Sequence, residues 1–148
     1  KIVLNDEYEK INKDKFIPLF KDSKNIKIIQ EAMFSSTNEV LGTSYRSRIE
    51  DLKYQFAGKT GTAQVKRITK QDRILDLKTF EIPYEERDHA LYIAFGPYQN
   101  PRYAISILIE HGGSGGSVAA PLAKKLFKKI IDRHEMRKNF QNKKYLDV

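Results

Sequence analysis

Two continuous apolar runs of strand length, residues 91–95 and 103–109, most strongly limit what this chain can fold into. The residues between them are rich in glycine, proline and asparagine. Apolar runs separated by such a connection are typical of an antiparallel hairpin. A further segment that begins at Phe56 also favours a strand, with small residues at its middle. We therefore expect three antiparallel strands, near residues 56–67, 89–96 and 102–111.

The C-terminal third predicts the clearest helix. Apolar residues recur there every four positions, in two adjacent rows: Val118, Leu122, Leu126 and Ile130, and beside them Ala119, Ala123, Phe127 and Ile131. A stripe this broad has to be buried. Because proline is tolerated only in the first turn, Pro121 places the start of the helix near Ser117. We expect the helix to cover residues 118–133 and to pack across one face of the sheet, while residues 136–148 fray.

A second helix is expected over residues 24–34, where apolar residues follow helical spacing and Ser23 can cap the first turn. Residues 35–53 contain clusters of serine, threonine, asparagine and glycine, which favour a loop. Residues 69–88 are polar and predict a long connection. Residues 1–22 mix charge with short apolar pairs and receive no firm assignment.

The charge balance leaves two interpretations open. The 148 residues carry a formal net charge of +8, much of it on the C-terminal helix and its tail. One interpretation is a basic nucleic-acid-binding domain. The other is the solvated face of a lysine-rich helix, which we favour because no zinc-finger, helix-turn-helix or RNA-recognition pattern is present. The chain lacks cysteine, and its three histidines lack metal-ligand spacing, so no metal and no cofactor are expected.

The segment Gly58-Lys59-Thr60-Gly61-Thr62 is the strongest candidate for chemistry. It ends like a phosphate-binding loop, but the required glycine five positions before Gly58 is a lysine, and a strand rather than a helix follows. In a strand, Lys59 and Gly61 share one face, and Thr60 and Thr62 share the other. A lysine and two hydroxyls beside a residue without a side chain can bind an anion such as a carboxylate. A glycine bulge in an ordinary strand is the alternative.

Further segments occur in a specific order around this one: Arg87-Asp88-His89-Ala90-Leu91, Asn100-Pro101-Arg102-Tyr103-Ala104, Glu110-His111-Gly112-Gly113-Ser114-Gly115-Gly116-Ser117 and Ala119-Ala120-Pro121. Together with the lysine–threonine–glycine motif, the series resembles the C-terminal part of the transpeptidase domain of class B penicillin-binding proteins, in particular the penicillin-binding protein 2 group. The resemblance covers roughly residues 24–133. It implies an α+β fold, in which helices pack on an antiparallel sheet as in part of a β-lactamase/transpeptidase-like domain.

The resemblance also implies an activity and roles for residues. Such enzymes are serine-type D,D-transpeptidases that cross-link peptidoglycan stem peptides through an acyl-enzyme and bind β-lactams, on the periplasmic face of the bacterial inner membrane. By resemblance, Lys59 supplies positive charge at the catalytic site. The hydroxyls of Thr60 and Thr62 hold the substrate carboxylate, and Gly61 allows close approach. The backbone N–H of Thr62 forms half of an oxyanion hole.

The sequence departs from this family at the nucleophile. No serine in the 148 residues is followed by lysine three positions later, so the Ser-x-x-Lys motif is absent from this chain. Ser36-Thr37-Asn38 fits the family's Ser-x-Asn motif, but it lies in an expected loop close to Lys59, and we interpret it as coincidence. We therefore expect a C-terminal fragment that is inactive alone and has the upstream part of the same domain as its partner. A non-catalytic structural remnant is the alternative.

Three smaller expectations follow. Without the rest of the domain, the strand near 102–111 has an unpaired edge, which favours self-association through that edge or disorder in residues 1–22. The run Gly112-Gly113-Ser114-Gly115-Gly116 is expected to be a flexible connection, where glycine permits positive φ, rather than an anion site at a helix start. His89 and His111 are expected to be packed or hydrogen-bonded rather than catalytic.

Overall fold

The structure is a computed structural model that describes residues 21–67 and 77–144, with side chains through residue 139. Its order is α1 (Ser23–Asn38), β1 (Ala57–Ala63), β2 (His89–Gly96), β3 (Tyr103–Ile109), a π-helical turn (Gly115–Ala119) and α3 (Ala120–Lys144). Short 3-10 turns occur at Tyr45–Ser47, Thr79–Glu81 and Tyr84–Glu86. The expectation for residues 1–20 lies outside the described residues.

The three strands form one antiparallel sheet in the order β1-β2-β3. In this register Lys59 pairs with Ile93, and Thr60 pairs with Tyr92, which in turn pairs with Ile107. The predicted α+β fold and three-stranded antiparallel sheet are therefore confirmed. β1 is shorter than expected and ends at Ala63, and soon after it the N–H of Val65 donates to the carboxylate of Asp88 instead of continuing the ladder.

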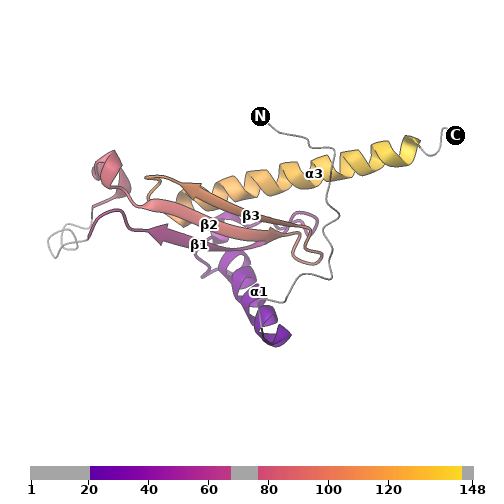
Figure 1. The fold of residues 1–148 in the computed structure, drawn as a ribbon, viewed down its shortest axis with the longest axis horizontal. Helices are drawn as coiled ribbons and strands as arrows, with labels where there is room; N and C mark the ends of the chain where they lie inside the picture. The colour runs from indigo at the N-terminus through magenta and orange to yellow at the C-terminus, as the bar shows by residue number, and fades with distance from the viewer. Residues whose placement is uncertain (1–20, 68–76, 145–148) are drawn as a thin grey trace.

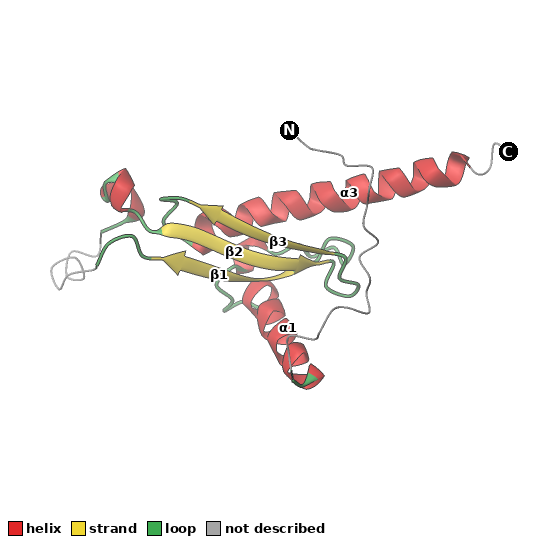
Figure 2. Ribbon diagram, in the orientation of Figure 1, coloured by secondary structure: helices red, strands yellow, loops and turns green. Residues whose placement is uncertain are grey.

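One face of the sheet packs against α3, which runs behind the strands in Figures 1 and 2. The core contains Tyr92 from β2 and Phe127 from α3, with Phe56 between them: its ring stacks on Phe127 at 5.0 Å and meets Tyr92 edge-on at 6.4 Å. The opposite face is open in the described part of the chain, where Ile93 is 51% and Leu108 57% exposed. The sheet therefore has one buried and one solvent-facing side, as antiparallel sheets often do.

The C-terminal helix differs from its prediction in two respects. Of the two apolar rows, the one fully buried is Ala119, Ala123, Phe127 and Ile131, whereas Val118, Leu122 and Leu126 remain over a third exposed. The helix also continues to Lys144, beyond the expected end at residue 133. The side chains of His134 and Glu135 contact Tyr103 and Arg102 at the start of β3. Five of the residues from 137 to 144 are lysine, arginine or glutamine, which are good helix formers.

The first helix is longer than the predicted 24–34. Its N-cap is Asp22 rather than Ser23, because the Asp22 carboxylate accepts a hydrogen bond from the N–H of Lys24 at 2.8 Å. At the other end, the Asn38 amide donates to the carbonyls of Phe34 and Phe56. The second bond connects the last turn of the helix to the segment before β1. The segment Ser36-Thr37-Asn38, expected in a loop, therefore forms the last turn of α1.

A buried hydroxyl junction of Thr37, Ser44 and Tyr92 joins α1, the following loop and the sheet. The Tyr92 hydroxyl lies 2.9 Å from the Thr37 hydroxyl and 3.1 Å from that of Ser44. Thr37 Oγ1 also accepts from the N–H of Gly58 at 3.0 Å. Burial raises the pKa of Tyr92, so its hydroxyl stays protonated and can donate within the junction. Gly58 has to be glycine, because a Cβ there would lie 2.3 Å from the Tyr92 hydroxyl oxygen.

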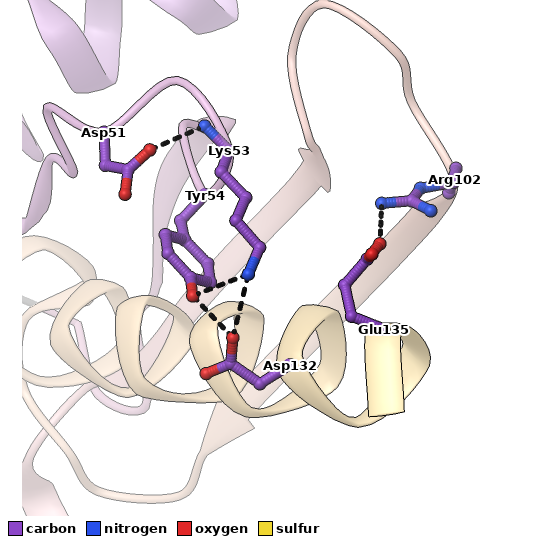
Figure 3. Close-up of polar contacts among 6 residues, drawn as sticks. All are labelled: Asp51, Lys53, Tyr54, Arg102, Asp132 and Glu135. Carbon is purple, nitrogen blue, oxygen red and sulfur yellow. Dashed lines mark hydrogen bonds and ion pairs between the residues drawn. The ribbon is translucent and has the colours of Figure 1, made fainter. Parts of the chain in front are cut away.

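Polar contacts join α3 to the segments that precede β1 and β3 (Figure 3). The Tyr54 hydroxyl donates to the Asp132 carboxylate at 2.5 Å, and the Lys53 ammonium lies 3.4 Å from the same oxygen. One turn further, Arg102 pairs with Glu135 at 3.6 Å. The hydrogen bond from Tyr54, and then the contact with Lys53, hold the pKa of Asp132 below its ordinary value.

The hydroxyl junction predicts a stability change on replacement of Thr37 by valine. Thr37→Val keeps the shape but removes the acceptor for the Gly58 N–H and a partner of Tyr92, leaving buried polar groups unpaired. We expect the free energy of unfolding to fall by about 1–3 kcal/mol. Urea unfolding followed by circular dichroism measures it. The matched change at the exposed Thr43, Thr43→Val, should cost less than about 0.5 kcal/mol because water replaces the lost contacts; equal losses would contradict the junction.

The Asp132 contact predicts a dependence of stability on pH. A carboxyl whose pKa is depressed by folding stabilises the fold fully above its ordinary value of 3.8, and loses this contribution as the pH falls through the depressed pKa. The thermal midpoints of the natural chain and Asp132→Asn should therefore differ at pH 6 and converge as the pH falls below the ordinary carboxyl pKa of 3.8. Glu85→Gln, on an exposed side chain, serves as control. A difference in midpoint that stays constant with pH would exclude this linkage.

Candidate functional site

The lysine–threonine–glycine segment lies at the middle of β1, which is an edge strand within the described residues because it pairs only with β2. It is a regular strand, with every residue of 57–63 in register, so the alternative of a glycine bulge is wrong. Lys59 and Gly61 lie on the open face of the sheet, and Thr60 and Thr62 lie on the face toward α1 and α3.

The free edge of β1 is open at Thr60 and Thr62. Thr37 bonds both the N–H and the carbonyl of Gly58, so the backbone groups of Gly58 point away from β2. Backbone groups of alternate residues point to the same side of an antiparallel strand. Those of Thr60 and Thr62 therefore point outward as well, away from β2. The Thr60 carbonyl accepts a hydrogen bond from the Lys59 ammonium, so a chain laid along the edge would replace that contact there.

Lys59 presents a positive charge at this edge. Its side chain is exposed, and its ammonium donates to the carbonyl of Thr60 at 2.9 Å. No carboxylate and no side-chain hydroxyl pairs with it in the described ranges 21–67 and 77–139. A lysine held only by a carbonyl of its own strand can turn to an incoming anion at little cost.

Thr60 belongs to a chain of three hydroxyls. Its Oγ1 lies 3.0 Å from the hydroxyl oxygen of Thr43, which lies 3.2 Å from that of Ser36. Each hydroxyl has one proton to donate and lone pairs to accept. If Ser36 donates to Thr43 and Thr43 to Thr60, the Thr60 proton is left to point at a ligand. Thr62 is exposed, and the structure shows no hydrogen bond for its hydroxyl to another described group.

The segment Ser36-Thr37-Asn38 supports the site from behind. The Ser36 hydroxyl connects to Thr60 through the hydroxyl of Thr43. Thr37 accepts from the N–H of Gly58, and the Asn38 amide donates to the carbonyl of Phe56. Sequence reasoning missed this support, because a three-residue pattern in an expected loop carries little information. The one signal was the concentration of hydroxyl residues in 35–44.

The glycine run also backs the site. A Cβ on Gly115 would lie 2.4 Å from the carbonyl oxygen of Leu91 and 2.6 Å from that of Gly61, so the π-helical turn packs directly on the strand backbones. Only Gly113 in the run has a positive φ, of 79°. The expectation that positive φ explains the glycines is therefore wrong at Gly115, where close packing requires glycine. Gly61 itself would meet only the Cβ of Leu91, at 3.3 Å, and its open side faces solvent.

The two histidines of the strand ends contact each other. The N–H of His111 donates to Nδ1 of His89 at 2.9 Å, and the ring centroids are 4.8 Å apart. Nδ1 of His111 lies 3.2 Å from the carbonyl of Arg87. Their expected packed and hydrogen-bonded state is confirmed. Among the described residues, no group of three or more histidine or acidic side chains could hold a metal ion.

Comparison with known proteins agrees with this geometry. Residues 7–128 match the model of the penicillin-binding protein transpeptidase domain. Peptidoglycan D,D-transpeptidase MrdA of Salmonella typhimurium is 37% identical over 105 residues, which are 71% of this chain and 16% of that protein. MrdA of Acinetobacter baumannii is 39% identical over 99 residues, which are 67% of this chain and 14% of that protein. The chain thus spans about a sixth of the length of these curated relatives.

Solved structures show the same fold. The chain aligns with the PBP2 protein of Helicobacter pylori, in its complex with MreC, at a TM-score of 0.57 and 34% identity, over 74% of this chain and 17% of that one. Pseudomonas aeruginosa PBP2 aligns at a TM-score of 0.57 and 30% identity, over 75% of this chain and 20% of that one. With the family model covering most of its length, the chain belongs to the penicillin-binding protein transpeptidase family.

Proposed function

We propose that this chain supplies the substrate-binding strand of a peptidoglycan D,D-transpeptidase and forms the C-terminal part of its catalytic domain. The observation that carries the proposal is the edge of β1, where Lys59 is exposed and the backbone groups of Thr60 and Thr62 point outward. The fold match to PBP2 proteins and the family match support it.

The edge of β1 fits an extended peptide that ends in a carboxylate. A stem peptide ending in D-Ala-D-Ala, or a β-lactam, would lie along β1 as an added strand and bond the outward groups of Thr60 and Thr62. Its terminal carboxylate would accept a hydrogen bond from the Thr60 hydroxyl and pair with the Lys59 ammonium. Both contacts would be charge-assisted. Because Gly58 is already bonded to Thr37, the added strand would not continue past that residue.

The outward N–H of Thr62 fits the role of oxyanion donor. In the proposed reaction, a serine hydroxyl attacks the carbonyl of the penultimate D-alanine, and negative charge develops on the carbonyl oxygen. The N–H of Thr62 and that of the serine would stabilise this charge. The terminal D-alanine then leaves with the proton, and the acyl group passes to an amine of a second stem peptide.

The serine has to come from outside these residues. None of the serines has lysine three positions later, and the matched residues make up only 16% of MrdA of Salmonella typhimurium. We propose that an upstream segment of the same domain provides it, and that the chain alone is inactive. The open face of the sheet, where Ile93 and Leu108 are exposed, is the surface that this segment or a second copy would cover.

The proposed place of action follows from the substrate. Peptidoglycan synthesis of this kind would place the whole protein at the periplasmic face of the bacterial inner membrane. None of the helices in the described part is long and apolar enough to cross a membrane.

A labelling experiment tests the function. The 148-residue chain is incubated with a fluorescent penicillin, alone and co-expressed with an upstream transpeptidase segment that bears a Ser-x-x-Lys motif. We expect no label on the chain alone and covalent label on the upstream segment of the pair. Lys59→Met should slow this labelling by about a hundredfold, because one oriented charge at the reacting group is lost. Lys27→Met, on the exposed side of α1, should leave the rate unchanged.

Two outcomes would contradict the proposal. Stable labelling of the 148-residue chain by itself would show a nucleophile within it. Equal labelling rates for Lys59→Met and Lys27→Met, in a pair that labels, would remove Lys59 from the site.

A further inference from the structure

A basic groove lies away from the β1 edge, between the turn Tyr45–Ser47 and the first turns of α3. It has a volume of about 520 Å³. Four cationic side chains line it: Arg46, Lys124, Lys125 and Lys128. No carboxylate lines it. The groove is therefore a local concentration of positive charge that the proposed transpeptidase reaction does not use.

The charges of the groove are not neutralised by the described protein. The structure shows no ion pair for Arg46, Lys124 or Lys125 with another described residue. The Lys128 ammonium lies 5.8 Å from the centre of the Tyr54 ring, and it lies close enough to Asp132 to lower the pKa of that carboxyl slightly. Like charges held around one cavity repel each other, and a bound anion relieves that repulsion.

Ser47 adds a second, independent observation. Ser47 is one of the residues that line the groove and is 1% exposed, and its buried hydroxyl has no hydrogen-bond partner in the described structure. Buried hydroxyls in folded proteins are almost always paired, so an unpaired one at the wall of a cavity points to a missing acceptor. The turn that carries it is closed by a backbone hydrogen bond, from the N–H of Ser47 to the carbonyl of Ser44 at 2.8 Å.

We propose that the basic groove binds a phosphoryl group. A phosphate monoester or pyrophosphate carries more than one negative charge and several acceptor oxygens, which match four cations and a free hydroxyl better than a single carboxylate does. Arg46 can bond two of its oxygens at once, the lysines act as point charges, and Ser47 donates its proton. The cations surround one compact cavity rather than a track, which fits a single anionic group.

Such a group could belong to a soluble phosphate compound or to a lipid headgroup. The probes are therefore pyrophosphate, and vesicles that contain phosphatidic acid, a phosphate monoester, compared with vesicles of phosphatidylcholine. Amide chemical shifts of the ¹⁵N-labelled 148-residue chain are followed by NMR, at an ionic strength held constant with chloride. We expect saturable shifts centred on Arg46, Ser47 and Ser117. Competition of phosphatidic acid vesicles with pyrophosphate assigns a lipid source. Saturable binding of pyrophosphate without that competition assigns a soluble source, and both results support the groove.

Variants separate a built site from general charge. Arg46→Gln with Lys124→Gln should weaken pyrophosphate binding at least tenfold, because charge-assisted contacts are lost. The control, Lys129→Gln with Arg133→Gln, removes the same net charge from α3 outside the groove lining and should change affinity less than twofold. Ser47→Ala should weaken binding about tenfold without lowering the thermal midpoint, because the hydroxyl has no partner to lose.

The proposal is overturned by any of three results. The shifts could be no larger than those caused by chloride alone. The groove and control variants could lose affinity equally, which would indicate bulk electrostatics. Ser47→Ala could retain full affinity, which would remove the hydroxyl from the site. Circular dichroism of each variant ensures that a loss of binding is not a loss of fold.

Discussion

The hydroxyl of Thr37 is the contact on which the rest of the structure depends. It bonds both backbone groups of Gly58, and it meets the hydroxyl of Tyr92, so one buried atom holds α1 to β1 and to the centre of the sheet. It also sets how much of the β1 edge is free. At Gly58 the outward groups are bonded to Thr37. At Thr60 and Thr62 they bond no other described strand, and the Thr60 carbonyl accepts only from the Lys59 ammonium. An edge strand is normally a hazard for unspecific pairing, and here the open length is restricted to the residues that the family motif occupies.

Glycine serves three different purposes around this edge. Gly58 leaves room for the Tyr92 hydroxyl in the core, and Gly115 lets the turn before α3 lie on the backbones of Gly61 and Leu91. Gly61 faces the other way, with open space beyond the Cβ of Leu91. The strand is therefore tightly packed on the face toward α1 and α3, and its opposite face is accessible. Rigid support of this kind is what a binding strand needs, because a ligand then meets groups that are already oriented.

Much of this could be predicted from the sequence, and the errors have physical causes. Strands 89–96 and 102–111 were predictable because apolar runs between turn formers leave few alternatives, and α3 because its apolar period is long. The end of α1 was not, since Asn38 and Thr37 are kept helical by partners in Phe56 and Gly58, distant in sequence. Serine, threonine and asparagine have low intrinsic helix propensities, so the sequence there favours a loop. The role of Gly115 could not be predicted either, because it depends on packing against the backbones of Gly61 and Leu91, which are distant in sequence.

The net charge of +8 illustrates why composition alone could not separate a solvated helix from a binding surface. The lysines of α3 are not equivalent. Lys129 is exposed and does not line the groove, whereas Lys124, Lys125 and Lys128 converge with Arg46 around one cavity beside an unpaired hydroxyl. Arg46 comes from a loop nearly eighty residues earlier, so no window along the sequence could reveal the cluster. Lys59, the cation of the β1 edge, lies on the open face of the sheet, opposite to α3. The two proposed anion sites therefore lie on opposite sides of the sheet.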